Sequence, residues 1–241
     1  MEQKESLTTA HSIGTGFLLL STNRHVVLIT AKHVVLNEDG SIKQNLAYRL
    51  NEKNTASDLV SDSGITNIVG NWFLSTNADL ACRIIAFGNE SDFATIPLDH
   101  LLPKMYVHAA TPVLVLGFPM GLRSEKYATP IARHGIVASA ADEDITLDAF
   151  VFPGNSGGPA IYSPVIKVGA NLNSPLINDE RIIGVVVDYI PYVDVAVSPQ
   201  TKRPRITFEE NSGLSHVVPS DKILELLNYA DFRKLDEQLA K

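Results

Sequence analysis

Residues 151–160 read VFPGNSGGPA and contain one serine, Ser156, enclosed by three glycines. Gly154 lies two positions before the serine, and Gly157 and Gly158 follow it directly. Glycine reaches backbone angles that other residues disfavour, so this stretch can form a sharp turn that presents a serine hydroxyl. It fits a nucleophile elbow, another kind of serine hydrolase turn, or an ordinary surface loop. The choice between them depends on the rest of the chain.

The elbow of the α/β-hydrolases has the pattern G-x-S-x-G and must connect a strand to a helix. Pro159 and the Ser163-Pro164 pair oppose a helix directly after Ser156, because proline removes a backbone donor. The elbow also requires the order serine, acid, histidine. Only His216 follows the serine, in a strand-like stretch, GLSHVVP. The sequence therefore argues against an esterase of this class.

The opposite order, histidine then aspartate then serine, is available upstream. HVVLITAKHVV contains His25, where an apolar strand is expected to begin, and His33, just past the end of that strand. A side chain beyond a strand end can project into a cleft, so His33 is the better candidate for a catalytic base. NADLACRII places Asp79 at the entrance to another strand, where an aspartate alone is more often a capping residue.

Taken together, these blocks resemble those of the chymotrypsin-fold (trypsin-like) serine endopeptidases. ITAKHVV, ADLACRII and GNSGGPA are similar to the histidine, aspartate and serine blocks of that family. VLVLGFPMGL followed by HGIVASA resembles the opening of the second barrel in bacterial HtrA-type proteases. GLSHVVPSDKILELL is similar to their last strand and closing helix. The matching blocks run from about Gly14 to Leu227.

The resemblance implies an all-β fold with two six-stranded antiparallel Greek-key barrels and a C-terminal α-helix. We expect residues 1–112 to form the barrel that carries His33 and Asp79, residues 113–219 the barrel that carries Ser156, and residues 220–241 the helix. The residues themselves favour the same class. Short apolar runs rich in valine and isoleucine, bounded by turn residues, are typical of strands, here 16–20, 26–31, 80–85, 113–116, 135–138, 182–187 and 217–218.

Two further local predictions concern the ends of these elements. From Ser220 onward, apolar residues recur at helical spacing, which predicts one amphipathic helix with Ser220 as its N-cap. Polar stretches at 51–64, 163–181 and 197–213 are too long for tight hairpins and predict long loops. An activating partner protein would be sought first at 163–181 and 190–212.

The resemblance also implies a role for each site residue. Ser156 would be the nucleophile, His33 the base that takes its proton, and Asp79 the group that holds the imidazole and stabilises the imidazolium. The backbone N–H groups of Gly154 and Ser156 would form the oxyanion hole.

The family position six residues before the serine, at the base of the primary pocket, is Phe150 here. Val187, Asp188 and Tyr189 would form the opposite wall. Phe150 and Val187 favour a small or medium apolar side chain of the substrate, unless Asp188 points inward.

Composition excludes several other functions. The 241 residues carry a net charge of −7, and the short basic cluster at 202–205 does not indicate a nucleic-acid surface. One cysteine rules out an internal disulfide and suits a reducing compartment, and neither a signal peptide nor a membrane helix is visible, so a cytoplasmic location is expected. The seven histidines are scattered, which predicts no metal site and no obligatory cofactor.

The chain also departs from its apparent relatives. It shows no Ile-Ile-Gly-Gly activation sequence, and it ends soon after the closing helix, without room for a peptide-binding PDZ module. We expect a polypeptide substrate. The alternative from another functional class is a catalytically silent member of the fold that binds peptides or a partner.

Overall fold

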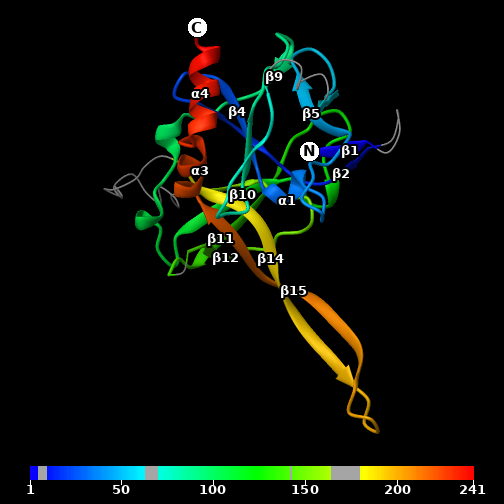
Figure 1. The fold of residues 1–241 in the computed structure, drawn as a ribbon. Helices are drawn as coiled ribbons and strands as arrows, with labels where there is room; N and C mark the ends of the chain where they lie inside the picture. Colours follow the sequence, from blue (N-terminus) through cyan, green and yellow to red (C-terminus); the bar gives the residue numbers. More distant parts are fainter. Residues whose placement is uncertain (5–9, 63–69, 142, 164–179) are drawn as a thin grey trace, which may run out of the picture.

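A computed structural model describes residues 1–4, 10–62, 70–141, 143–163 and 180–241, and within these ranges strands predominate (Figure 1). The second half of the chain forms a closed antiparallel barrel. Its six strands follow the order β10 (Pro112–Gly117), β11 (Ile131–Ser139), β12 (Ile145–Asp148), β15 (Pro204–Pro219), β14 (Arg181–Val197) and β13 (Pro159–Tyr162). Alternate residues of β10 point inward, and Val113 and Val115 are fully buried. The prediction of an all-β fold is confirmed.

The first half consists of two antiparallel sheets in the described residues. One contains β3 (Phe17–Leu20), β4 (Val26–Thr30), β8 (Ala81–Ile84) and β7 (Phe73–Leu74), in that order. The other contains β2 (Ala10–Ser12), β1 (Glu2–Lys4), β5 (Leu46–Glu52) and β6 (Asp58–Ser61), with β9 (Ser91–Asp92) paired to β5. Short 3-10 turns η1 (Leu98–His100), η2 (Lys104–Tyr106) and η3 (Pro119–Gly121) lie in the connections.

The C-terminus forms two helices, α3 (Ser220–Leu227) and α4 (Ala230–Leu239), so the prediction of one continuous helix is wrong. The break lies at Asn228, whose side-chain amide donates to the Leu224 carbonyl at 2.9 Å, and at Tyr229, whose backbone is extended. Asparagine side chains compete for backbone groups in this way and favour helix ends. Phe232 of α4 meets Phe73 edge-on, with ring centroids 5.3 Å apart.

The predicted N-cap is also wrong. Pro219 occupies the capping position, and Ser220 is the first helical residue. The Ser220 hydroxyl is buried and donates to the Leu102 carbonyl, so it does not cap the helix but attaches it to the connection between η1 and η2. No helix in the described ranges has the length and apolar character needed to cross a membrane.

A long two-stranded ribbon projects from the barrel, where loops were expected at 190–212 and 197–213 (Figure 1). The ribbon pairs residues 191–197 of β14 with residues 204–211 of β15. Valine, isoleucine, tyrosine and phenylalanine are frequent here, and on β15 they alternate with polar residues, which is typical of strands. Of the other expected loops, 51–64 contains β6, and 163–181 lies mostly outside the described residues.

Candidate active site

The pairing of β4 with β8 brings His33 and Asp79 together. Thr30 at the end of β4 lies opposite Ala81 at the start of β8, so the residues just beyond these positions are neighbours. His33 lies on the short helix α1 (Lys32–Val35), which begins immediately after β4. The backbone N–H of Lys32 donates to the Asp79 carbonyl at 3.3 Å and closes this corner.

Both carboxylate oxygens of Asp79 bind His33. The ring Nδ1 lies 2.6 Å from Oδ2, and the His33 backbone N–H donates to Oδ1 at 3.0 Å. An ionised carboxylate can only accept, so Nδ1 carries the proton in this bond. The neutral tautomer fixed in this way leaves Nε2 as an acceptor on the opposite side of the ring. About half of the His33 side chain is exposed, so Nε2 can be reached by a substrate.

The pKa of Asp79 lies below its ordinary value of 3.8. Burial acts to raise it, but the hydrogen bonds from His33, the charge that His33 can carry and the nearby Lys32 together outweigh burial. Asp79 is therefore an anion throughout the neutral range and can stabilise an imidazolium.

Ser156 lies in the turn between β12 and β13, against the same end of β4. Its carbonyl accepts a hydrogen bond from the Thr15 N–H at 2.8 Å. A Cβ atom on the neighbouring Gly157 would lie 2.2 Å from the Thr30 hydroxyl and 3.0 Å from the Ala31 nitrogen. Only glycine fits this approach, which holds the serine turn beside the segment that leads into His33.

Gly154 adopts the left-handed region with φ of 101°. The preceding carbonyl, of Pro153, accepts from the Met120 N–H at 2.6 Å, and no peptide bond in the described chain is cis. In a trans peptide the N–H points opposite to the carbonyl, so the Gly154 N–H faces away from Met120. Within the described part of the chain, no acceptor bonds the N–H of Gly154 or of Ser156. Both donors are therefore free to receive an oxyanion.

A family model described as the trypsin-like peptidase domain matches residues 14–163, a range that contains His33, Asp79 and Ser156. The chain belongs to the trypsin-like peptidase family. The region matched ends after β13, so β14, β15 and the two C-terminal helices of this trypsin-like peptidase lie beyond it.

Solved structures similar to this trypsin-like peptidase include the HtrA-type protease AlgW with a tripeptide, at a TM-score of 0.49 and 16% identity over 90% of this chain and 55% of the other. AlgW with a decapeptide gives a TM-score of 0.45 and 17% identity over 95% and 53%. The chain thus spans about half the length of these structures. A search of curated proteins gives no match.

Of the four predicted pocket residues, two line a cavity that Asp79 also lines. Val187 and Asp188 of β14 lie there, in a space of about 500 Å³. Asp188 accepts a hydrogen bond from the Nδ1–H of His216 at 2.7 Å, so its carboxylate is paired with that ring. Tyr189 instead packs against the core of the closed barrel.

Phe150 is not among the residues that line this cavity. It is half-exposed, and its ring lies against Gly213 of β15, 3.3 Å from where a Cβ atom would be. Its carbonyl accepts from the Arg133 guanidinium at 3.0 Å. Among the described residues, no group of three or more histidine, cysteine, aspartate or glutamate side chains is arranged to hold a metal ion.

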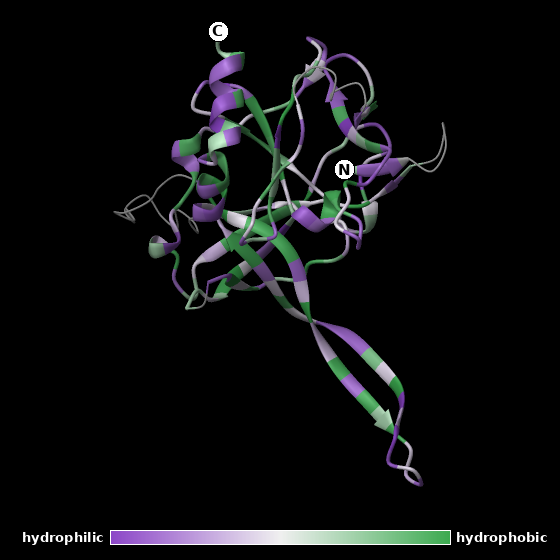
Figure 2. Ribbon diagram, viewed as in Figure 1, coloured by the Kyte–Doolittle hydropathy of each residue, from purple (hydrophilic) through white to green (hydrophobic). Residues whose placement is uncertain are grey.

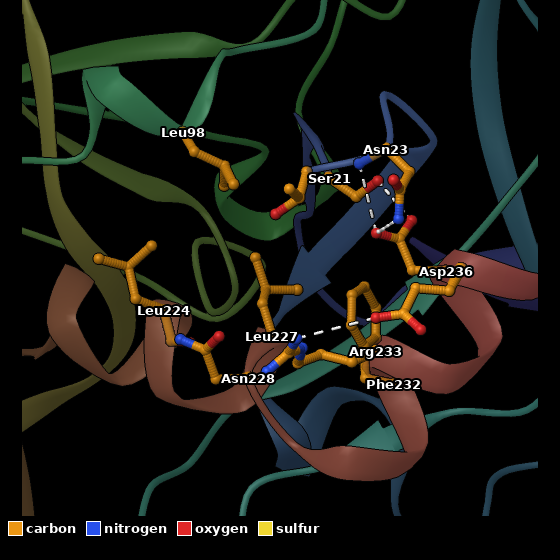
Figure 3. Close-up of a pocket in the computed structure, with 11 residues that line it drawn as sticks. Ser21, Asn23, Leu98, Leu224, Leu227, Asn228, Phe232, Arg233 and Asp236 are labelled. Carbon is orange, nitrogen blue, oxygen red and sulfur yellow. Dashed lines mark hydrogen bonds and ion pairs between the residues drawn. The ribbon is translucent and has the colours of Figure 1, made fainter. Parts of the chain in front are cut away.

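His25 belongs to a different cluster, which sequence reasoning did not predict. Its Nδ1 lies 2.7 Å from Asp236 of α4, a nearly buried carboxylate. Asp236 also accepts from the Ser21 hydroxyl and, at 2.9 Å, from the Asn23 amide (Figure 3). The Ser21 hydroxyl donates to the aspartate and not to the histidine ring, so His25 is not placed to take its proton. The cluster attaches α4 to the turn between β3 and β4. No motif in the sequence predicts this cluster.

We expect Asp236→Ala to lower the free energy of unfolding by about 2–3 kcal/mol, because the donors of Ser21, Asn23 and His25 lose a shared buried acceptor. The pKa of Asp236 lies below 3.8: burial acts to raise it, but the bonds from those three residues outweigh burial. A carboxyl with a depressed pKa stabilises the fold above its unfolded-state pKa and loses this effect as pH falls through its folded-state pKa.

The difference in stability between wild type and Asp236→Ala should therefore be constant above about pH 5 and shrink as pH falls below 3.8. Urea unfolding across this pH range measures it. Lys241→Ala, an exposed change at the C-terminus, is the control and should leave stability unchanged. A difference that grows on acidification would contradict this role of Asp236.

Proposed function

We propose that the chain is an active serine endopeptidase in which Ser156, His33 and Asp79 hydrolyse peptide bonds through an acyl-enzyme. The observation that carries the proposal is the double contact between Asp79 and His33, which fixes the ring with Nε2 free, beside the serine turn. The residue types and chain order of His33, Asp79 and Ser156, and the packing of the serine turn against the end of β4, all support this proposal.

In the proposed mechanism, the Ser156 oxygen attacks the peptide carbonyl carbon while His33 Nε2 takes the hydroxyl proton. The C=O electrons move onto oxygen, and the N–H groups of Gly154 and Ser156 stabilise the resulting anion. The carbonyl re-forms, the C–N bond breaks, and His33 returns the proton to the leaving amine. Water then attacks the acyl-enzyme in the same way and releases Ser156. Asp79 stays ionised throughout.

The alternative is a catalytically silent member of the family that only binds peptides. Two features favour the enzyme. A silent member needs neither the tautomer that Asp79 imposes nor a turn in which no described acceptor bonds the N–H groups of Gly154 and Ser156. Both features have a direct use in acyl transfer.

For substrate selection, we propose that Phe150, Val187, Asp188 and Tyr189 form the pocket for the residue before the cleaved bond. Phe150 and Val187 would supply apolar surface to this pocket, and the Asp188 carboxylate is paired with His216, so we expect a preference for a small or medium apolar side chain.

We expect Phe150→Asp to raise cleavage after lysine and arginine, relative to cleavage after apolar residues, by about tenfold or more. A carboxylate at the base of the pocket would pair with the basic side chain. Phe93→Asp, another exposed phenylalanine outside the proposed pocket, is the control and should leave the preference unchanged. An unchanged preference in Phe150→Asp would place the pocket elsewhere.

Cleavage-site profiling with a peptide library tests the function as a whole. Wild type should produce cuts with a shared apolar preference, and Ser156→Ala should produce none. Binding of peptides without cleavage by either protein would favour the silent alternative.

A further inference from the structure

The ribbon of β14 and β15 has no partner in the described chain beyond the barrel. Residues 191–197 pair only with residues 204–211, and the figure shows the ribbon standing clear of the body (Figure 1). All of these residues are exposed except the half-buried Asn211 at the base. An isolated two-stranded ribbon is at best marginally stable in water, so this arm needs a partner.

The arm also concentrates apolar surface. Among the described residues, sixteen large apolar side chains are exposed, and six of them lie on the arm: Tyr192, Val193, Val195, Val197, Ile206 and Phe208. On β15 they alternate with polar residues, whereas on β14 Tyr192 and Val193 are adjacent and only Ala196 separates Val195 from Val197. The arm is coloured by hydropathy in Figure 2. A patch of exposed apolar side chains of this kind marks an interaction site.

We propose that the partner is a second copy of this chain, joined through the free edge of β15 in the arm. Two copies of one strand can pair antiparallel only about a twofold axis perpendicular to the sheet. One residue then lies opposite its own copy, and residues equally far on either side of it face each other. The strand must therefore be complementary to its own reverse.

Residues 205–209, Arg-Ile-Thr-Phe-Glu, have this property. With Thr207 on the twofold axis, Arg205 faces Glu209 of the second copy, and Ile206 faces Phe208 of the second copy. Opposite charges, apolar pairs and threonine pairs are the favourable cross-strand combinations. Each combination except the central threonine pair occurs twice by symmetry.

The faces of the resulting four-stranded sheet are consistent with this register. Ile206 and Phe208 share one face, so the two copies bring four apolar side chains together there. Arg205 and Glu209 share the other face, where two ion pairs form beside the central threonines. The perpendicular axis keeps each face on the same side in both copies.

The other edge of the arm does not offer the same match. Self-pairing of β14 about Asp194, near the middle of its arm segment, would place that carboxylate opposite its own copy, which is unfavourable. The charge pattern therefore selects β15.

Charge reversal tests the pairing by sedimentation equilibrium. Wild type should have twice the 26.2 kDa mass of one chain. Arg205→Glu and Glu209→Arg each place like charges opposite one another twice and should weaken the dimer about tenfold or more. The double variant restores opposite charges and should recover the wild-type dimer. A monomeric wild type, a different stoichiometry, or a double variant no better than either single one would overturn the proposal.

A disulfide tests the register independently of affinity. Thr207→Cys places one thiol opposite its own copy and should give a covalent dimer on mild oxidation. Val195→Cys, opposite Thr207 on the other strand of the same arm, is the matched control and should remain uncrosslinked. The only native cysteine, Cys82, is buried and does not compete. Equal crosslinking of both variants would reject this register.

Discussion

We expect His33→Ala to lose peptide hydrolysis almost completely, with kcat lowered by about 10⁴–10⁶. Among the described residues, His33 is the one side chain that bonds the Asp79 carboxylate beside the serine turn, so we expect its imidazole to take the Ser156 proton. Substrate affinity should change little, because His33 acts on the reacting atoms. Steady-state kinetics on a peptide cleaved by wild type separates kcat from KM.

His25→Ala is the matched control for this prediction. His25 also bonds an aspartate, Asp236, but it fastens α4 and lies in a different cluster. This variant should retain wild-type kcat in folded protein, although its melting temperature falls. Loss of turnover in His25→Ala alone, with His33→Ala still active, would show that the base has been assigned to the wrong histidine.

The second large effect is expected at Gly154. In Gly154→Ala the new Cβ would lie 2.3 Å from the Phe118 carbonyl, and φ of 101° is strained for any side chain. The turn must shift, which moves one of the two donors off the developing oxyanion. Loss of one such donor typically lowers kcat by about 10²–10³. Kinetics on the folded variant, checked by circular dichroism, measures the loss.

Gly40→Ala separates the effect of the turn from that of backbone strain. Gly40 also has a positive φ, 81°, but nothing lies within 4 Å of its added Cβ. This variant should lose a little stability and keep full activity. If the two variants lose activity equally, the Gly154 donor has no special part in catalysis.

Much of the site could be predicted from sequence because its parts lie at strand ends. His33 follows β4 and Asp79 precedes β8, so the antiparallel pairing of these strands, rather than any local motif, makes them neighbours. The glycines around Ser156 indicated a constrained turn, and the close approach of Gly157 to Thr30 supplies the constraint. The glycines and the strand ends can be recognised in a single sequence, whereas the pairing that brings His33 to Asp79 is a property of the fold.

The predictions that failed concern contacts between distant segments. Nothing near Asp236 in the sequence indicates that it would bind the turn at Ser21, and nothing near Ser220 indicates that its hydroxyl would reach Leu102. The sequence predicts a loop at 197–213 because this stretch is polar, rich in turn residues and too long for a tight hairpin. That pattern equally fits a ribbon with both faces in solvent, and composition alone does not separate the two.

Labelling with a fluorophosphonate probe, followed by peptide mapping, tests the central claim most directly. Such a probe reacts with a serine hydroxyl only when a base activates it. We predict one labelled site, Ser156, in the folded wild type, and no label in Ser156→Ala or His33→Ala. A folded wild-type protein that stays unlabelled, or that carries the label on another serine, would contradict the account.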